Sequence, residues 1–279
     1  MEILLPEEKY NWFYEIANPL SEVLHADIQV KPNYEFDYSK DKIYILVGCE
    51  NMTECHAKRY IVYQFEQLFA KTGPNYTIAL LKYKELMKKA MCVWEYSYVN
   101  VPILKEQNVK HVPLGYSPCM TLCDKHEKTI DTIFFGNVLK RRIQILKELQ
   151  SEFDVTIFTN VFGYHKKCLL KQSKITLNIH MEDPAVSCLE TVRILYSIAN
   201  HSLVVSEPSG DSYTDRIFSK VVIFTNDIAS TLRYLLKHPE IVKARADYAF
   251  EWLTKEYTYK SILSKLTDFV DDVPHLYKD

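Results

Sequence analysis

The stretch SKITLNIHMEDPAVSCLETVRILYSIANHSLVVSEPSGD, residues 173–211, predicts one complete strand, loop, helix and strand. Residues 174–179 are short, apolar and β-branched, which is typical of a buried strand. From Ser187 to Asn200 apolar residues recur every three or four positions, as on one helix face, and Ser187 can cap its start. Residues 203–206 form the second strand. The pattern is that of a parallel α/β sheet, in which ligands bind at the edge where the strands end.

Polar side chains gather at that edge. His180, Glu190, Arg193 and Glu207 stand in otherwise apolar surroundings. Glu190 and Arg193 are three residues apart, so they share a helix face. A carboxylate there can accept both hydroxyls of a ribose, and the free N–H groups at a helix start can bind a diphosphate. The alternative interpretation is a surface ion pair between the two side chains.

The composition limits the class of protein. The chain has 279 residues, 47% of them hydrophobic, and a formal charge of -2, which fits two ordinary domains and does not favour a nucleic-acid or membrane-surface partner. The first residues lack the basic and apolar regions of a signal peptide, and no stretch approaches the roughly 20 apolar residues of a membrane span. The seven cysteines are scattered. We therefore expect a cytoplasmic protein with reduced thiols.

The scarcity of glycine disfavours some function classes. There are 6 glycines, and neither a G-x-G-x-x-G nor a P-loop pattern occurs, which argues against a doubly wound oxidoreductase and an NTPase. Cys119, Cys123 and His126 could supply three metal ligands. A fourth ligand is missing and the spacing matches no usual zinc pattern, so ordinary linker thiols are favoured and no metal site is expected.

Two successive α/β units are expected. Strands are predicted at 42–47, 59–65, 110–114, 132–135, 154–158 and 221–225, and helices at 10–24, 76–91, 99–107, 142–149, 227–236 and 239–270, with a break near Tyr257. Residues 117–129 lose apolar periodicity and are polar and charged, which is typical of a linker. We therefore expect an N-terminal domain of residues 1–118 and a C-terminal domain of residues 119–279.

The turn after the first strand of the second unit is cationic. Gly136 and Asn137 form the turn, and Lys140, Arg141 and Arg142 follow at the start of a helix. Three cations beside helical N–H groups suit a diphosphate, because charge-assisted donors and the helix dipole act together. A solvated basic patch is the alternative.

Five stretches carry a resemblance to a known family. They are KRYIVYQFEQL (58–68), VWEYSYVN (93–100), VPLGYSP (112–118), FFGNVLKRR (134–142) and residues 177–207 of the opening stretch. Together they resemble small GT-B glycosyltransferases of bacteria and large DNA viruses. More specifically, the compact length of the chain and the style of its sequence resemble those of chlorovirus glycosyltransferases that build capsid glycans, among them a xylosyltransferase. The resemblance implies a GT-B fold, with two Rossmann-like domains whose parallel sheets face a central cleft.

The resemblance also implies a donor site in the C-terminal domain. Glu190 would bind the ribose hydroxyls of a sugar nucleotide, and Arg193 would neutralise the leaving group or orient Glu190. The other implied contacts are the diphosphate for Asn137, Arg141 and Arg142, the base for Thr159 and Asn160, and the diphosphate or donor sugar for His180 and the backbone of Ser187. Retaining enzymes of this fold carry a glutamate seven residues before the ribose-binding one. Asp183 stands there in this chain, so an inverting reaction is expected.

The predicted reaction is transfer of a sugar from a nucleoside diphosphate sugar to a hydroxyl of a glycan or glycoprotein acceptor. The donor would be a UDP-sugar such as UDP-xylose, or a GDP-sugar, and no cofactor and no protein-bound metal are expected. Glu50, directly after a buried strand, is the expected base, with Glu95 as the second candidate. The alternative role for a carboxylate at the position of Glu50 is that of a helix cap. A viral protein of this kind would act in the host cytoplasm. The alternative function is a non-catalytic carbohydrate- or nucleotide-binding protein of the same fold.

Overall fold

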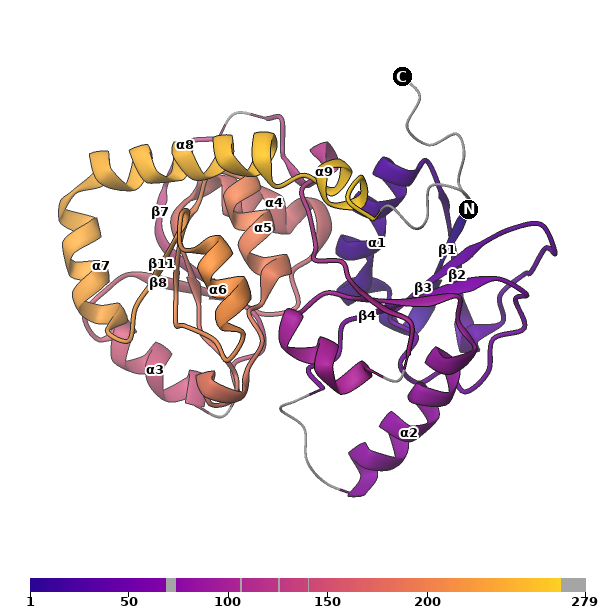
Figure 1. Ribbon diagram of the computed structural model, residues 1–279. Helices are drawn as coiled ribbons and strands as arrows, with labels where there is room; N and C mark the ends of the chain where they lie inside the picture. Colours follow the sequence, from indigo (N-terminus) through magenta and orange to yellow (C-terminus); the bar gives the residue numbers. More distant parts are fainter. Residues whose placement is uncertain (69–73, 106, 125, 140, 267–279) are drawn as a thin grey trace.

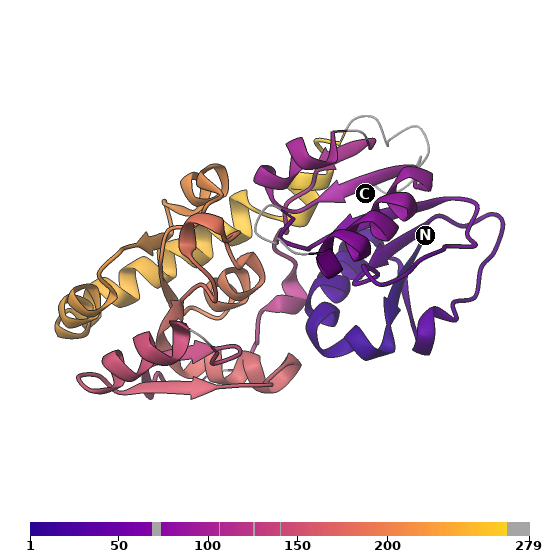
Figure 2. The same cartoon turned by 90° about the horizontal axis from the view of Figure 1, so that it is seen from below.

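The computed structural model describes residues 1–68, 74–105, 107–124, 126–139 and 141–266, and the side chains of residues 74–80 are outside the description. The described chain forms two α/β units, each built around a parallel β-sheet (Figures 1 and 2). The first unit runs from indigo to magenta and the second from rose to yellow. This arrangement confirms the predicted fold class.

The first sheet has six parallel strands in the order β2-β1-β3-β4-β5-β6. Its strands are β1 (Glu2–Pro6), β2 (Asp27–Lys31), β3 (Tyr44–Val47), β4 (Tyr60–Gln64), β5 (Cys92–Glu95) and β6 (Val109–His111). The inner strands β1, β3, β4 and β5 are buried along their whole length, as expected when helices cover both faces of a parallel sheet. Sequence patterning missed β1 and β2, which are short and carry charged residues, and it also missed the four-residue strand β5.

Two α-helices and several 3-10 turns accompany this sheet. The helices are α1 (Tyr10–Leu24) and α2 (Pro74–Lys89), and the 3-10 turns are η1 (Glu7–Lys9), η2 (Pro32–Tyr34), η3 (Tyr98–Leu104) and η4 (Pro118–Met120). The helix predicted at 99–107 is the 3-10 turn η3. It contains Pro102, which lacks the N–H that a continuing α-helix needs.

The second sheet has five parallel strands in the order β11-β10-β9-β7-β8. They are β7 (Ile130–Phe135), β8 (Val155–Phe158), β9 (Ser173–Asn178), β10 (Leu203–Ser206) and β11 (Val222–Phe224). The accompanying helices are α3 (Arg141–Gln150), α4 (Gly163–Gln172), α5 (Thr191–Ala199), α6 (Ser212–Phe218), α7 (Ile228–Lys237), α8 (Pro239–Glu256) and α9 (Tyr259–Leu263), with the 3-10 turn η5 (Pro184–Val186). The predicted break near Tyr257 is confirmed, and residues 267–270 of the predicted helix lie outside the described residues.

Helix α5 begins later than the sequence pattern predicts. Ser187 is extended, with φ -112° and ψ 138°, and the regular helix starts at Thr191. Pro184 and the turn η5 occupy the preceding residues. Glu190 therefore stands at the residue before the helix rather than inside its first turns. Its carbonyl still accepts the Ile194 N–H at 3.3 Å, so the spacing to Arg193 is helical.

Side-chain contacts join the two units on one side of the molecule. Ser97 Oγ donates a hydrogen bond to the carboxylate of Asp211, the N-cap of α6. The rings of Tyr98 and Tyr213 stack with centroids 4.3 Å apart. Both contacts place η3 against α6, and they bring two segments more than 100 residues apart in sequence together.

The last described helix returns to the first unit. Figure 1 shows α8 crossing the second unit and leading to α9, which lies beside α1. The Tyr116 N–H bonds to the Tyr257 carbonyl and the Tyr259 N–H to the Tyr116 carbonyl, each at 2.9 Å. A side chain at Gly115 would meet the Tyr259 backbone nitrogen at 2.6 Å, so this close approach requires glycine.

Candidate functional site

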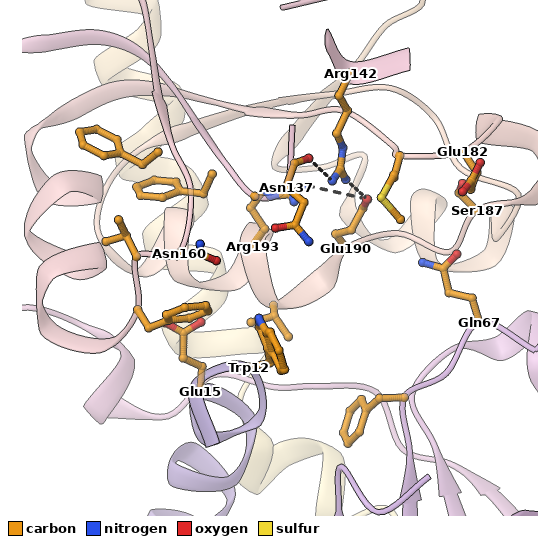
Figure 3. A pocket seen from close by; sticks show the side chains of 18 of the residues that line it. Trp12, Glu15, Gln67, Asn137, Arg142, Asn160, Glu182, Ser187, Glu190 and Arg193 are labelled. Atoms are coloured by element: carbon orange, nitrogen blue, oxygen red, sulfur yellow. Dashed lines mark hydrogen bonds and ion pairs between the residues drawn. The ribbon is translucent and has the colours of Figure 1, made fainter. Parts of the chain in front are cut away.

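A cleft of about 950 Å³ lies between the two units, at the ends of their strands. Figure 3 shows side chains from both units directed into it. The N-terminal wall is formed by Trp12, Glu15, Phe65, Glu66 and Gln67. The C-terminal wall includes the turn after β7, the loop after β8, the loop after β9 and the start of α5. This position is the ligand-binding edge that the strand pattern predicts.

Glu190 is the centre of a hydrogen-bonded cluster on the C-terminal wall. Its Oε1 lies 3.0 Å from Arg142 Nη2 and 3.8 Å from Arg193 Nη1. Its Oε2 accepts from Asn178 Nδ2 at 3.1 Å and lies 2.8 Å from His180 Nδ1. Both carboxylate oxygens are thus engaged by neighbouring side chains. The sequence predicted a pair with Arg193, and the structure adds Arg142, His180 and Asn178.

The cluster holds Glu190 ionised. Burial would raise the pKa of Glu190, but the hydrogen bond and charge of His180 and the charges of Arg193 and Arg142 lower it to about 2. Burial would likewise lower the pKa of His180, yet its contact with Glu190 and the charges of Glu190 and Glu207 raise it above the ordinary value. His180 Nε2 lies 3.3 Å from the Glu207 carbonyl oxygen, and Nδ1 lies 2.8 Å from Glu190 Oε2.

Two guanidinium groups share the space above one aromatic ring. Arg142 and Arg193 lie over the Phe134 ring, with 5.4 Å and 5.3 Å from their central carbons to its centroid. Gly136 has φ +134°, and a Cβ there would meet Arg193 Nη2 at 2.9 Å. Because Gly136 has no side chain, the guanidinium of Arg193 can occupy this space. Both arginines line the cleft.

Arg141 is engaged in a different pair. Its guanidinium donates to both oxygens of Glu207, at 2.8 and 2.5 Å, and to the His180 carbonyl at 2.9 Å. Arg141 is not among the described residues that line the cleft. Its hydrogen bonds to Glu207 and to the His180 carbonyl nevertheless order the loop after β9. Lys140, the other cation of this turn, lies outside the described residues.

The residues predicted for the donor site fall into two groups, those that line the cleft and those that do not. Asn137, Asn160 and Ser187 line the cleft, together with Arg142, Glu190 and Arg193 (Figure 3). Thr159 is exposed and His180 is fully buried behind Glu190, and neither contributes to the lining. Six of the nine predicted residues therefore meet on one wall, and their proposed ligand contacts stay predictions.

The two predicted bases lie away from the cleft lining. Glu50 pairs with the Lys9 ammonium, and its side chain is 15% exposed. Glu95 is completely buried and accepts from Ser97 N at 2.9 Å, and from Asn100 and Gln64 at 3.1 Å each. Burial raises the pKa of Glu95 to about 8, against the lowering effect of these donors.

Sequence patterning did not identify the cleft residues of the N-terminal wall. Glu15 and Lys166 form a buried ion pair at the edge of the cleft, 2.5 Å from Oε2 to Nζ. Glu15 also accepts the Gly163 N–H at 3.1 Å, at the start of α4. The one local signal was a charged residue on the otherwise apolar face of the helix predicted at 10–24. Its partner, 151 residues later, cannot be inferred from that pattern.

Within the described ranges, no group of three or more His, Cys, Asp or Glu residues is placed to hold a metal ion. Over the same part of the chain, every helix is too short or too polar to cross a membrane.

No protein-family model matches the sequence. An uncharacterized protein, R358, of Acanthamoeba polyphaga mimivirus is 36% identical over 124 residues, which is 44% of this chain and 44% of that protein. The alignment thus covers less than half of either protein, and it shows a viral relative without giving a function.

Solved structures of glycosyltransferases share the fold. TarM of S. aureus, solved with fondaparinux, α-GlcNAc-glycerol and UDP, superposes with a TM-score of 0.60 at 15% identity over 82% of this chain, which spans 55% of TarM. The DNA-modifying β-glucosyltransferase, whose substrate is uridine diphosphoglucose, gives 0.60 at 11% identity over 98% of this chain and all of that one. WaaG, a glycosyltransferase of lipopolysaccharide biosynthesis, superposes with a TM-score of 0.60 at 8% identity. The superposition covers 96% of this chain and 99% of WaaG. The chain has the GT-B fold of these glycosyltransferases.

Proposed function

We propose that the protein is a glycosyltransferase that moves a sugar from a nucleoside diphosphate sugar to a hydroxyl of a glycan acceptor. The observation that carries the proposal is the cluster around Glu190, on the C-terminal wall of the cleft. It unites one carboxylate with two guanidinium groups, those of Arg142 and Arg193, and with the imidazole of His180. The excess positive charge, held at the ends of parallel strands, suits a ligand diphosphate.

The cluster would serve the reaction by stabilising the leaving group. As the bond from the anomeric carbon to the diphosphate breaks, negative charge grows on the departing phosphate oxygens. Arg142 and Arg193 are already oriented by Glu190 and Phe134, so little reorganisation would be needed when that charge develops. Protein cations of this kind can perform the role without a protein-bound metal.

The acceptor hydroxyl needs a base, and the N-terminal unit offers three glutamates that directly follow or end its strands. Glu50 and Glu95 were predicted from sequence, and Glu66 lines the cleft two residues after β4. Glu66 therefore joins them as a candidate, on the ground of position. Direct deprotonation by such a carboxylate would give inversion at the anomeric carbon.

The donor is proposed to be a UDP-sugar, with UDP-xylose as one specific candidate and GDP-sugars as the competing class. The solved TarM complex contains UDP, and the β-glucosyltransferase uses uridine diphosphoglucose, which favours uridine. The acceptor is proposed to be a glycan or glycoprotein rather than nucleic acid.

The test is a panel of UDP- and GDP-sugars, UDP-xylose included, incubated with the protein and with mixed oligosaccharides. Release of UDP or GDP, followed by mass spectrometry of the glycan product, would support the proposal and identify the donor. Binding of a nucleotide with no release, with or without acceptors, would instead favour a non-catalytic binding protein of the same fold. Absence of nucleotide binding by calorimetry would overturn the donor site.

A further inference from the structure

Trp12 is unusually exposed for its residue type. The chain has three tryptophans, all in its described part, and Trp94 and Trp252 are 3% and 5% exposed whereas Trp12 is 55% exposed. Trp12 lies in the first turn of α1 and lines the cleft. Figure 3 shows its ring across the cleft from Asn137 and Arg193. A large apolar ring left open inside a polar cleft indicates a surface that a ligand covers.

The neighbours of Trp12 on the N-terminal wall add polar and acidic groups. Glu66 and Gln67 line the same wall, directly after β4. A sugar ring presents an apolar face of C–H groups and an edge of hydroxyls. A flat indole matches the face, and carboxylate and amide groups match the hydroxyls.

The charge of this wall disfavours an anionic acceptor. The described lining residues of the N-terminal unit include no lysine or arginine, and the carboxylate of Glu15 on this wall is already paired with Lys166. A nucleic acid or a phosphorylated glycan would bring negative charge to this wall, whereas nucleic-acid sites are basic. The cations of the cleft belong to the opposite wall, where the diphosphate is proposed to bind.

We propose that Trp12 is the stacking platform of an acceptor subsite that takes a neutral sugar residue. The inference rests on the proposed function, because it assigns the cationic wall to the donor and the Trp12 wall to the acceptor. Trp12 is a positioning residue in this arrangement: it holds the acceptor ring while its hydroxyl faces the donor.

Fluorescence quenching by acrylamide tests the site directly, since Trp12 is the indole that a neutral quencher reaches. The probes are maltose, cellobiose, lactose and xylobiose as neutral sugars, and a fondaparinux-like sulfated oligosaccharide and a DNA oligonucleotide as anions, each with UDP present. At least one neutral disaccharide is expected to lower the quenching constant about twofold. In the variant Trp12→Phe, the fluorescence that acrylamide quenches should disappear, which assigns this signal to Trp12.

Steady-state kinetics with the best neutral acceptor supplies the second measurement. Trp12→Ala is expected to raise the acceptor KM about tenfold, the loss of one ring contact, while kcat and the Kd for UDP change less than about twofold. Trp12→Phe keeps a flat ring and should recover most of the affinity. Tyr248→Ala, which removes a 52% exposed ring on α8 outside the cleft, is the matched control and should behave as wild type.

The outcomes separate this inference from the proposed function. Protection of Trp12 by anionic probes alone, protection by UDP alone, or no protection by any probe would each overturn the acceptor subsite. UDP binding together with any of these results leaves the donor proposal standing. Protection by neutral sugars in a protein that binds no nucleotide would support the subsite and overturn the transferase.

Discussion

The carboxylate of Glu15 on α1 and the ammonium of Lys166 on α4 form a buried ion pair that joins the two units of the fold, 2.5 Å from Oε2 to Nζ. Their side chains are 6% and 9% exposed. Lys166 also lies 5.1 Å from the centre of the Tyr196 ring, whose hydroxyl donates to the Glu15 carbonyl at 3.0 Å. The pair is therefore one part of a connected network at the edge of the cleft.

Removing one partner of this pair should be costly. Lys166→Met would leave the Glu15 carboxylate buried without its counter-charge, and the free energy of unfolding should fall by about 3–5 kcal/mol in urea denaturation. The double variant Glu15→Gln with Lys166→Met should recover much of the loss. Lys243→Met is the matched control, because Lys243 and Asp247 form an exposed pair, and its effect should stay below about 1 kcal/mol. Equal losses at the two lysines would contradict the network.

Glu190→Ala should weaken binding of UDP by about 1–3 kcal/mol, because it removes the group that orients Arg142 and Arg193 and leaves buried donors unpaired. Isothermal calorimetry measures the change. Glu152→Ala, at an exposed pair with Arg233, is the control and should leave the Kd unchanged. Unaltered affinity in Glu190→Ala would remove the donor site from this wall.

Two glycine positions offer a paired test of the room around Arg193. Gly136→Ala places a Cβ 2.9 Å from Arg193 Nη2 at φ +134°, so it should displace the guanidinium and weaken UDP binding about tenfold. Gly163→Ala has φ +58° and no atom within 4 Å of the new Cβ. Its cost should be about 1 kcal/mol of stability with unchanged UDP affinity. Similar Kd values in the two variants would contradict the steric role of Gly136.

The raised pKa of Glu95 predicts that the stability of the fold depends on pH. Its carboxyl keeps a proton in the folded state up to about pH 8 but loses it near pH 4.5 when unfolded. The unfolded chain therefore binds fewer protons between these values, and the free energy of unfolding should fall with rising pH, by on the order of 1 kcal/mol per unit. Glu95→Gln should lack this slope, so its stability relative to wild type should rise from pH 5 to pH 8. Parallel profiles in urea denaturation would show that Glu95 does not titrate there.

Kinetics of three glutamine variants test the base. Glu50→Gln, Glu66→Gln and Glu95→Gln each remove one ionisable carboxylate of similar volume. The variant that loses the base should transfer sugar at least about a hundredfold more slowly, with the Kd for UDP unchanged. Normal turnover in a variant removes that residue from the role. Glu66 is favoured by its position in the cleft lining.

The sequence predicts the C-terminal unit better than the N-terminal one, for physical reasons. Strands such as Leu203–Ser206 are buried on both faces and read as uninterrupted apolar runs, so the prediction of this strand is confirmed residue for residue. The edge strand β2, DIQVK, is exposed or half-buried and carries charges at both ends, so no such run marks it. Helix α6 has seven residues, too few for a periodic pattern, and was not predicted.

The C-terminal wall of the cleft could likewise be predicted from sequence better than the N-terminal wall. Glu190 and Arg193 are neighbours in sequence, and their helical spacing predicted that they would share a face. Arg142 joins them from 48 residues away because parallel strands end at one edge, a rule that sequence order can use. Trp12 and Glu15 reach the cleft through the packing of one unit on the other, which no local pattern encodes.

The hydrogen bonds between Tyr116 and residues 257–259 have a consequence for biosynthesis. Tyr259 is 1% exposed, and α9 packs against α1, so the N-terminal unit is not complete until the chain beyond the second sheet has been made. A nascent chain that ends before residue 257 would leave the α1 surface beneath α9 uncovered. Domains usually fold in order as they leave the ribosome. Packing of the first unit would therefore be completed only by α9, the last described helix, and ribosome-bound fragments should acquire protease resistance in both units together.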